Sequence, residues 1–489
     1  MRSTFDLYHI AATGMYVNQA GLSVVSNNLS NVTTPGYSRQ KLASAEKVAG
    51  TADGSPSYGC GTSVLKISRA RDNFLDQTYR QVNGRVVYYN LKHALLEDGQ
   101  KMLNEYGVTD KSNESGKGLQ QMIKNFFNSW DQLSKGIEGA RSTIVGNATA
   151  LINAFSQINT QLLEMQQDAG NRVKDSVDML NTCAQELVAL NREIVRAEAG
   201  GEKNGNLRDQ RDTLLNTISS LANSSVDEQP NGAVDVRIGG VALVQGDITH
   251  TLAVVRTDRS LEVKWVGLDI DAGISSGSIK ANLEETDRNT DKAIAEVGYN
   301  FVPQNSSALT DLRQGLNHLL TTIVDKVNSL LQSGKDLYGN AGEALFVKIN
   351  DDGPLELGNI KVNPAIANNV NKIAAGTSGA QSDYTVAVKI NGLQNERIFS
   401  YNGLTMTGTD FYQALLSWIG TLGNTAGSKY DTQATLLMQV RNQRDAISSV
   451  SQDEEMSKMI AYQNAYNASA RVLSTIDSLI SDLINKLGR

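Results

Sequence analysis

The feature that most restricts the fold is a pair of apolar seams, one near each end of the 489-residue chain. In the first seam, residues recur at alternating steps of three and four, the spacing of a heptad repeat on one helix face. Its members are Tyr8, Ala11, Met15, Asn18, Leu22, Val25 and Leu29. Pro35 cannot continue a helix, because it lacks an N–H donor and restricts the residue before it. The first seam therefore predicts a helix of about 25 residues that ends in a polar turn.

The second seam lies at the far end of the chain and keeps the same spacing for longer. Its members are Met459, Tyr462, Tyr466, Ser469, Leu473, Ile476, Ile480, Leu483 and Leu487. Upstream, Ser451 and Glu454 have the spacing of a capping box, in which each side chain bonds to the other residue's backbone N–H. No matching seam lies near either one in the sequence. We therefore expect the first and last helices to pair with each other.

The interior between the seams favours long helices. Only 6 residues are Pro, against an average usage of about 5%. Apolar stripes of helical period predict an antiparallel bundle. These stripes and helical segments cover residues 69–106, 119–133, 144–165, 173–194, 206–222, 278–333 and 408–489, with a break near Pro303. Residues 41–63 are polar and Gly-rich and are followed by a possible short strand at 64–67.

Two interior regions instead favour β structure. Residues 234–238, 241–244, 252–255 and 261–265 form short apolar or alternating runs separated by turn signals. Farther on, residues 384–390 and 397–401 flank Asn391-Gly392, a dipeptide typical of a type I′ hairpin turn. The predicted fold class is mainly α with β insertions, a long helix bundle with a terminal coiled-coil pair and one or two small β domains.

The same patterns predict a nested domain organisation. We expect a terminal coiled-coil domain from residues 1–60 and 447–489, and a helical bundle from 61–225, 276–337 and 404–446. The β-rich outer part would then comprise residues 226–275 and 338–403. The two cysteines, Cys60 and Cys183, are too few for a disulfide framework, and two free thiols are expected.

Several functional classes are disfavoured. The net charge is −7 without a basic stripe, which argues against nucleic-acid binding. No run approaches 18 apolar residues, so no membrane insertion is expected, and the first residues lack the apolar region of a cleaved signal peptide. The four His are scattered, and no P-loop, GxGxxG, HExxH or GxSxG pattern occurs. We therefore expect no enzyme activity, no catalytic residues, no metal and no cofactor.

Two weaker signals have simpler explanations. Asp269 and Asp271 begin like a calcium loop, but Lys280 stands where the bidentate Glu should be. The charged residues Arg208, Asp209, Arg211 and Asp212 are interpreted as ion pairs on a helix surface rather than as a binding site.

Residues 26–37, Ser-Asn-Asn-Leu-Ser-Asn-Val-Thr-Thr-Pro-Gly-Tyr, resemble the N-terminal motif of the axial proteins of the bacterial flagellum, the rod and hook family. The positions that carry the motif are Asn28, Asn31, Thr34, Gly36 and Tyr37. Further stretches resemble the hook-associated junction proteins within that family. These are residues 206–212, 243–246, 338–346 and 453–484.

This resemblance implies a structural subunit of the hook–filament junction, located outside the cell in the flagellum. Such a subunit is exported by the flagellar type III apparatus and polymerises at the distal end of the hook as an adaptor for filament assembly. The implied partners are further copies of the chain in a short helical zone, the hook protein, the second junction protein and an export chaperone that binds the C-terminal region. Tyr37 and Arg39 are candidates for contacts with neighbouring subunits.

Two alternatives remain open. The chain could be another axial component, such as the second junction protein or a hook or rod protein. It could also be a soluble secreted coiled-coil module or effector, in which the second seam packs only within its own chain. Ordering about 60 terminal residues costs on the order of 60–120 kcal/mol of backbone entropy, and roughly 14 buried apolar side chains return only about 1.5–3 kcal/mol each. We therefore expect the termini to be mobile in the monomer and to order on assembly.

Overall fold

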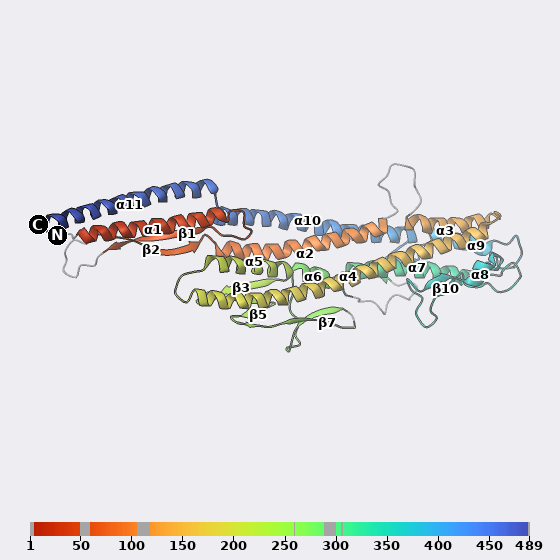
Figure 1. The fold of residues 1–489 in the computed structure, drawn as a ribbon. Coiled ribbons are helices and arrows are strands. Elements are labelled where there is room, and N and C mark those ends of the chain that lie inside the picture. Colours follow the sequence, from red (N-terminus) through yellow and green to blue (C-terminus); the bar gives the residue numbers. More distant parts are fainter. Residues whose placement is uncertain are drawn as a thin grey trace.

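The computed structural model describes residues 4–48, 59–104, 118–258, 260–287, 300–304 and 307–487. Within these residues the chain forms an elongated, mostly helical rod with small sheets, which confirms the predicted fold class (Figure 1). The two ends of the chain lie together at one end of the rod.

The first and last helices pair lengthwise, as their seams predicted. α1 spans Thr4–Ser30 and packs along α11, Gln452–Leu487. α1 stops before Pro35, and Gly36 then takes a positive φ of 82°, a backbone conformation that glycine adopts without strain. The chain thereby turns away from the helix pair at the predicted break.

A β hairpin covers a second face of α1. β1, Gln40–Val48, pairs antiparallel with β2, Gly59–Arg69. The short strand predicted at residues 64–67 lies within β2, which is longer than predicted. No strand was predicted for β1, because its composition is polar and only one face of the hairpin packs on a helix. The backbone N–H of Thr62 donates to Thr13 Oγ1 of α1 at 3.3 Å.

The body of the rod is a bundle of long helices (Figure 1). α4 is a single helix of 58 residues, Ala140–Ala197, so the stripes at 144–165 and 173–194 belong to one continuous element. α2 pairs with α10 through close contacts at glycines, including His93 Nδ1 3.1 Å from the carbonyl oxygen of Gly423. The helix bounds are α2 Asn73–Asn104, α3 Leu119–Ser134, α5 Gly205–Leu221, α6 Gly277–Glu284, α7 Ala308–Gln332 and α10 Gly408–Ser448.

Two hydrophobic cores lie along α4. The first contains α3, the N-terminal part of α4, α7 and the start of α10, around the fully buried Trp130. The second contains the C-terminal part of α4, α5 and the strands from residues 224 to 265, around Trp265. The two β-leaning regions of the sequence therefore belong to different cores.

The first β-leaning region forms strands as predicted. Four strands pair antiparallel in chain order and two more form a separate hairpin. The bounds are β3 Ser224–Glu228, β4 Val234–Ile238, β5 Val241–Gln245, β6 Ile248–Thr249, β7 Leu252–Arg256 and β8 Leu261–Trp265. This sheet packs on α4 and closes the second core.

The hairpin predicted around Asn391-Gly392 is wrong. Residues Thr385–Gly392 form helix α9 instead. Val386 and Ile390, four residues apart, are both buried in the first core, whereas a strand would also place Val388 on that face. Val388 is 56% exposed. The alternation of Val and Ile is typical of a strand, but burial of Val386 and Ile390 in the first core stabilises the helix instead.

The remaining elements near this end are short. β12 pairs antiparallel with β13 and parallel with β9. Their bounds are β9 Asn300–Phe301, β10 Phe346–Lys348, β11 Ile360–Val362, α8 Pro364–Asn368, η1 Val370–Lys372, η2 Leu393–Asn395, β12 Phe399–Tyr401 and β13 Leu404–Met406. The domain limits predicted at 60/61 and 403/404 fall inside β2 and inside the β12–β13 hairpin.

Candidate functional site: the polar joint

The seam residues of α1 and α11 face each other but are only partly covered. On α1, Ala11 and Val25 are buried and Tyr8 is 42% exposed. The other α1 seam residues, Met15, Asn18, Leu22 and Leu29, are half-buried. On α11, Ile476 is buried, and Met459, Tyr462, Tyr466, Ser469, Leu473 and Ile480 are half-buried. Leu483 and Leu487 lie in the helix, but their side chains are outside the described part of the structure.

Two glycines of α1 allow the close approach of α11. A Cβ atom on Gly21 would lie 2.6 Å from the ring of Tyr462, and one on Gly14 would lie 3.2 Å from Ser469 Oγ. Their spacing of seven residues places both glycines on one face of α1. These contacts were not predicted from the sequence, although the heptad spacing of the two glycines is visible in it.

Asn28 is the centre of the connection between the helix pair and the rest of the chain. It is fully buried, and its amide makes four hydrogen bonds. Nδ2 donates to the carbonyl oxygen of Gln40 and to Glu455 Oε2, both at 2.9 Å. Oδ1 accepts from Tyr37 Oη at 2.8 Å and from the backbone N–H of Gln40 at 2.9 Å. These bonds use the full capacity of an asparagine side chain.

The other motif residues shape the turn that follows α1. Asn31 Nδ2 donates to the Asn27 carbonyl oxygen at 2.9 Å, and Thr34 Oγ1 donates to Asn31 Oδ1 at 3.2 Å. A Cβ on Gly36 would lie 2.8 Å from Thr213 of α5. Burial, and then the nearby carboxylates, raise the pKa of Tyr37 to about 12, so its hydroxyl stays a donor.

Arg39 holds the turn between α10 and α11. Its backbone N–H donates to the carbonyl oxygen of Ser448 at 2.9 Å. Its guanidinium donates to Glu455 Oε1 at 3.0 Å and to Glu454 Oε2 at 2.6 Å. Glu454 therefore pairs with Arg39, and the capping box keeps its Ser451 bond to the Glu454 amide at 3.5 Å. Within the single chain, Tyr37 and Arg39 make intrachain contacts.

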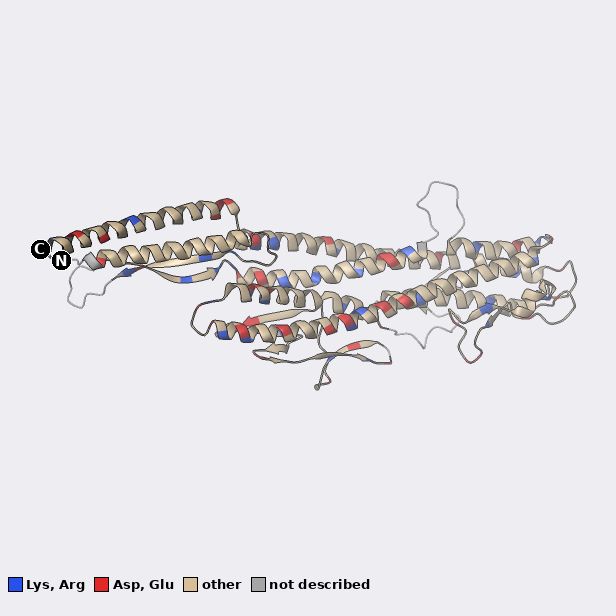
Figure 2. Cartoon of the chain, in the orientation of Figure 1, with Lys and Arg blue, Asp and Glu red and all other residues tan. Residues whose placement is uncertain are grey.

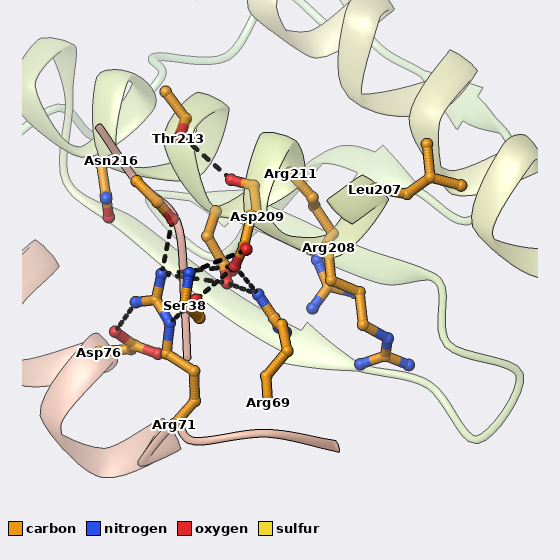
Figure 3. A network of polar contacts seen from close by, with 12 residues as sticks. Ser38, Arg69, Arg71, Asp76, Leu207, Arg208, Asp209, Arg211, Thr213 and Asn216 are labelled. Carbon is orange, nitrogen blue, oxygen red and sulfur yellow. Dashed lines mark hydrogen bonds and ion pairs between the residues drawn. The ribbon is translucent and has the colours of Figure 1, made fainter. Parts of the chain in front are cut away.

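A buried ionic network continues from this point into the body (Figure 3). Asp209 of α5 accepts from the backbone N–H of Ser38 at 3.0 Å and also from the Ser38 hydroxyl. Arg69, the last residue of β2, lies 2.7 Å from both Asp209 and Asp212. Arg80 of α2 lies 3.1 Å from Asp212. We call this network, together with the contacts of Asn28 and Arg39, the polar joint. Its members are Asn28, Tyr37, Ser38, Arg39, Arg69, Arg71, Asp76, Arg80, Asp209, Asp212, Glu454 and Glu455.

The interpretation of Arg208, Asp209, Arg211 and Asp212 as surface ion pairs is wrong, because all four are buried. Arg208 pairs with Glu198 at 2.6 Å, and Arg211 donates to the carbonyl oxygen of Gly232 at 2.9 Å. The partners of Asp209 and Asp212, which are Ser38, Arg69 and Arg80, come from segments distant in sequence, which a local charge pattern cannot reveal.

The charges of the joint keep Asp212 ionised. Its burial opposes ionisation, but the cations of Arg69 and Arg80 and of other nearby arginines outweigh this, and the pKa of Asp212 is lowered. Arg71 adds to the same cluster, pairing with Asp76 at 2.9 Å and donating to Ser38 Oγ at 2.7 Å. The arrangement holds the turn after α1, the end of β2, α2 and α5 together, and it does not present a reactive group to solvent.

Where the structure describes the chain, no three His, Cys, Asp or Glu residues are grouped so that they could hold a metal. Cys60 is half-buried and Cys183 is buried, and neither forms a disulfide in the described part of the chain. None of the described helices combines the length and apolar character needed to cross a membrane.

The chain is similar to known proteins of the bacterial flagellum. A family model described as the helical domain of flagellar hook-associated protein FlgK matches residues 108–346. A second, described as the C-terminal part of the flagellar basal body rod proteins FlgEFG, matches residues 442–486. Together the two matches cover more than half of the chain and include both α5 of the joint and most of α11.

Similar proteins align along the whole length. Flagellar hook-associated protein 1 of Bacillus subtilis strain 168 is 28% identical, with 100% of this chain and 99% of that protein covered. The protein of the same name from Escherichia coli K12 is 24% identical, with 98% and 99% covered. The flagellar hook junction protein FlgK of Burkholderia pseudomallei shares the fold, with a TM-score of 0.60 at 15% identity over 77% of this chain and 100% of that chain.

Proposed function

Because the chain belongs to the flagellar hook-associated protein 1 family, we propose that it is a structural subunit of the junction between hook and filament. It acts there as a non-enzymatic adaptor within the axial structure of the bacterial flagellum. Export through the flagellar type III apparatus and polymerisation at the distal end of the hook complete this proposal.

The observation that carries the proposal is the half-covered pair of helices at the chain ends. Most seam residues of α1 and α11 keep part of their apolar surface exposed, and α11 also exposes Met456, Ile460, Val472 and Leu479 by 51–58%. An isolated two-helix arm with this much open apolar surface fits an element completed by neighbouring copies. The seam residues on both helices are therefore assembly contacts in this proposal.

The polar joint sets the direction of that arm. It fastens the turn after α1, the end of β2 and the α10–α11 turn to α2 and α5 through buried polar contacts. In an axial assembly, the arm would line the inner tube and the body would face outward, with the joint fixing the angle between them. The motif residues Asn28, Asn31, Thr34, Gly36 and Tyr37 then serve assembly by shaping the joint.

The proposed partners follow from the position at the junction. Other copies of the chain form a short helical zone, with the hook protein on one side and the second junction protein on the other. An export chaperone would bind the C-terminal region before assembly, where the exposed apolar residues of α11 need cover.

Deletion of the gene in a flagellated cell tests the proposal. We expect hooks without attached filaments and filament subunits shed into the medium, both restored by the full-length chain. Complementation with a chain lacking residues 452–487 is the matched control, because it keeps the body but removes α11, and it should not restore attachment. Filaments that remain attached after deletion would contradict the junction role.

A further inference from the structure

The outer face of the β1–β2 hairpin carries an apolar surface with no cover in the described chain. Four successive residues of β2, Val64 to Ile67, are exposed, with Leu65 at 66%. The pairing register skips Leu65, since Ala43 faces Lys66 and Ser44 faces Val64. A bulge of this kind re-aims side chains and interrupts the alternation of the strand. The result is a small apolar patch at the bulge.

Two exposed lysines lie in or next to this patch. Lys66 lies within it, and Lys41 is exposed on the neighbouring strand, two residues from the partner of Lys66. Diagonal neighbours of this kind are about 7–8 Å apart. Neither lysine makes an ion pair with another described residue. We call Lys41, Leu65 and Lys66 the bulge patch.

A shallow groove on the body carries acidic residues, whereas the patch carries lysines. It lies between α4 and α5, with apolar side chains in its floor and glutamates at its rim. Its lining residues are Glu186, Ala189, Leu190, Glu193, Gln210, Thr213 and Leu214. Glu186 and Glu193 are exposed and form no ion pair within the described residues. They are seven residues apart, two helical turns or about 10.5 Å. Two flexible lysine side chains can span that separation.

The two surfaces are offset along the rod. Arg69, two residues beyond Ile67, contacts Asp209 and Asp212 of α5, the helix that forms one wall of the groove, and the hairpin extends from there toward the chain ends. Figure 2 shows basic positions on the hairpin and acidic positions along α4. Offset surfaces can meet when neighbouring copies are also displaced along a common helical axis.

We propose that the bulge patch of one copy docks in the α4–α5 groove of the neighbouring copy. Leu65, re-aimed at the bulge, covers Leu190 and Leu214, while Lys41 and Lys66 pair with the two glutamates of the rim. The patch and the groove are different surfaces, so the contact is heterologous and repeats from copy to copy. This lateral contact rests on the proposed function, because it supplies one interface of the junction zone outside the paired terminal helices.

A cross-linking experiment tests which copies meet. In a C60S/C183S background, one plasmid encodes L65C and a second encodes L190C, and both are expressed in a flagellated cell that lacks its own gene. Oxidation of isolated hook–filament structures is expected to give a band of twice the chain mass only when both variants are present. A chain that carries both L65C and L190C tests for contact within one copy. The proposal is overturned if that chain cross-links only within itself. It is also overturned if assembled copies that carry the single variants form no cross-link.

A charge exchange tests the chemistry of the contact. In the cross-linking background, K41E/K66E in one variant should lower the cross-linked fraction roughly tenfold by facing like charges across the interface. E186K/E193K in the other variant should do the same, and the two sets together should restore the band. The matched control is K361E/K389E at the other end of the rod, where both lysines are exposed, and it should have no effect. Equal loss from the control, or no rescue by the combined exchange, would contradict the pairing.

The two proposals fail in different ways. If deletion leaves filaments attached to hooks, the junction role is wrong whatever the cross-linking gives. If filaments detach on deletion and assembled zones contain the variants without a cross-link, the junction role stands and the lateral contact is wrong.

Discussion

Buried charges at the polar joint are the residues on which the orientation of the terminal arm depends most. Asp212 is 4% exposed and lies between Arg69 and Arg80 at 2.7 and 3.1 Å. Removing one partner of such a cluster leaves the remaining charges buried without compensation, which is far more damaging than losing an exposed pair. The joint is therefore strong only while every member is present and charged.

We expect Asp212→Asn to destabilise the protein by about 3–5 kcal/mol at pH 7. The matched control is Asp227→Asn, whose partner Arg237 lies 3.1 Å away on the surface and whose side chain is 61% exposed. The control should change stability by less than about 1 kcal/mol. Urea titration followed by circular dichroism measures both, and equal small effects would contradict the buried network.

The same carboxylate predicts a pH dependence. The pKa of Asp212 is lower in the folded chain than its ordinary value, so its contribution is fully present above about pH 4, the usual range of an unfolded Asp. That contribution is lost as the pH falls through the lower, folded value. Urea titrations repeated down to low pH should therefore show a decline in wild type that is smaller in the Asp212→Asn variant.

Gly21 gives a prediction that depends on packing rather than on charge, because α11 approaches α1 closely at this residue. Alanine would favour the helix by about 1 kcal/mol, but its Cβ would lie 2.6 Å from the Tyr462 ring. We expect Gly21→Ala to loosen the α1–α11 pair and to increase hydrogen exchange in α11 of the assembled junction, where the helices are otherwise protected. Gly146→Ala is the control, since nothing lies within 4 Å of its Cβ, and it should stabilise α4. Unchanged exchange in the Gly21 variant would show that the helices do not depend on this approach.

At the scale of elements, long periodic segments were predictable and cross-chain partnerships were not. The seams identified α1 and α11, because a heptad pattern over many residues is a strong signal. The buried charges of α5 looked like surface charges, since their partners Ser38, Arg69 and Arg80 are more than a hundred residues away in sequence. The residue pattern of a single helix does not reveal which distant segments pack against it.

Short elements were the least predictable for a related reason. Residues 384–390 have strand-like composition, yet they form α9 because the first core buries Val386 and Ile390 on one helical face. β1 was hidden by its polar composition, because it is covered on one side only by α1. In both cases the deciding contacts are tertiary and outweigh a weak local preference.

The exposed seam of the helix pair leads to a prediction about order. We expect amides of α1 and α11 to exchange quickly in the free monomer and to be protected in the assembled junction. The reference within the same molecule is α4, whose inward face is buried along both cores and which should be protected in both states. Strong protection of both terminal helices in the monomer would mean that they are stable without neighbours.

At the scale of the whole molecule, α4 is the element that connects the two cores. Its N-terminal part belongs to the first core and its C-terminal part to the second, with no break over 58 residues. A continuous helix transmits position between its ends, because its backbone hydrogen bonds leave little freedom to bend. The length of the rod and the placement of the polar joint relative to the first core thus depend on α4.

Gln167→Pro tests this connection. Gln167 is exposed on α4 between the two cores, and proline inside a helix costs about 3 kcal/mol or more and produces a kink. We expect both cores to remain folded while the maximum dimension measured by small-angle X-ray scattering becomes shorter. Gln167→Ala is the control and should leave the dimension unchanged. An unaltered length in the proline variant would mean that other contacts keep the rod straight.

The hydrogen bond between Asn28 and Glu455 joins residues that are 427 positions apart. A contact with so large a sequence separation cannot form until nearly the entire polypeptide is present, and such contacts form late in folding. A chain truncated before residue 452 would contain both cores and yet leave Asn28 and Arg39 without their glutamates. The polar joint therefore closes only after Glu454 and Glu455 have been added to the growing chain.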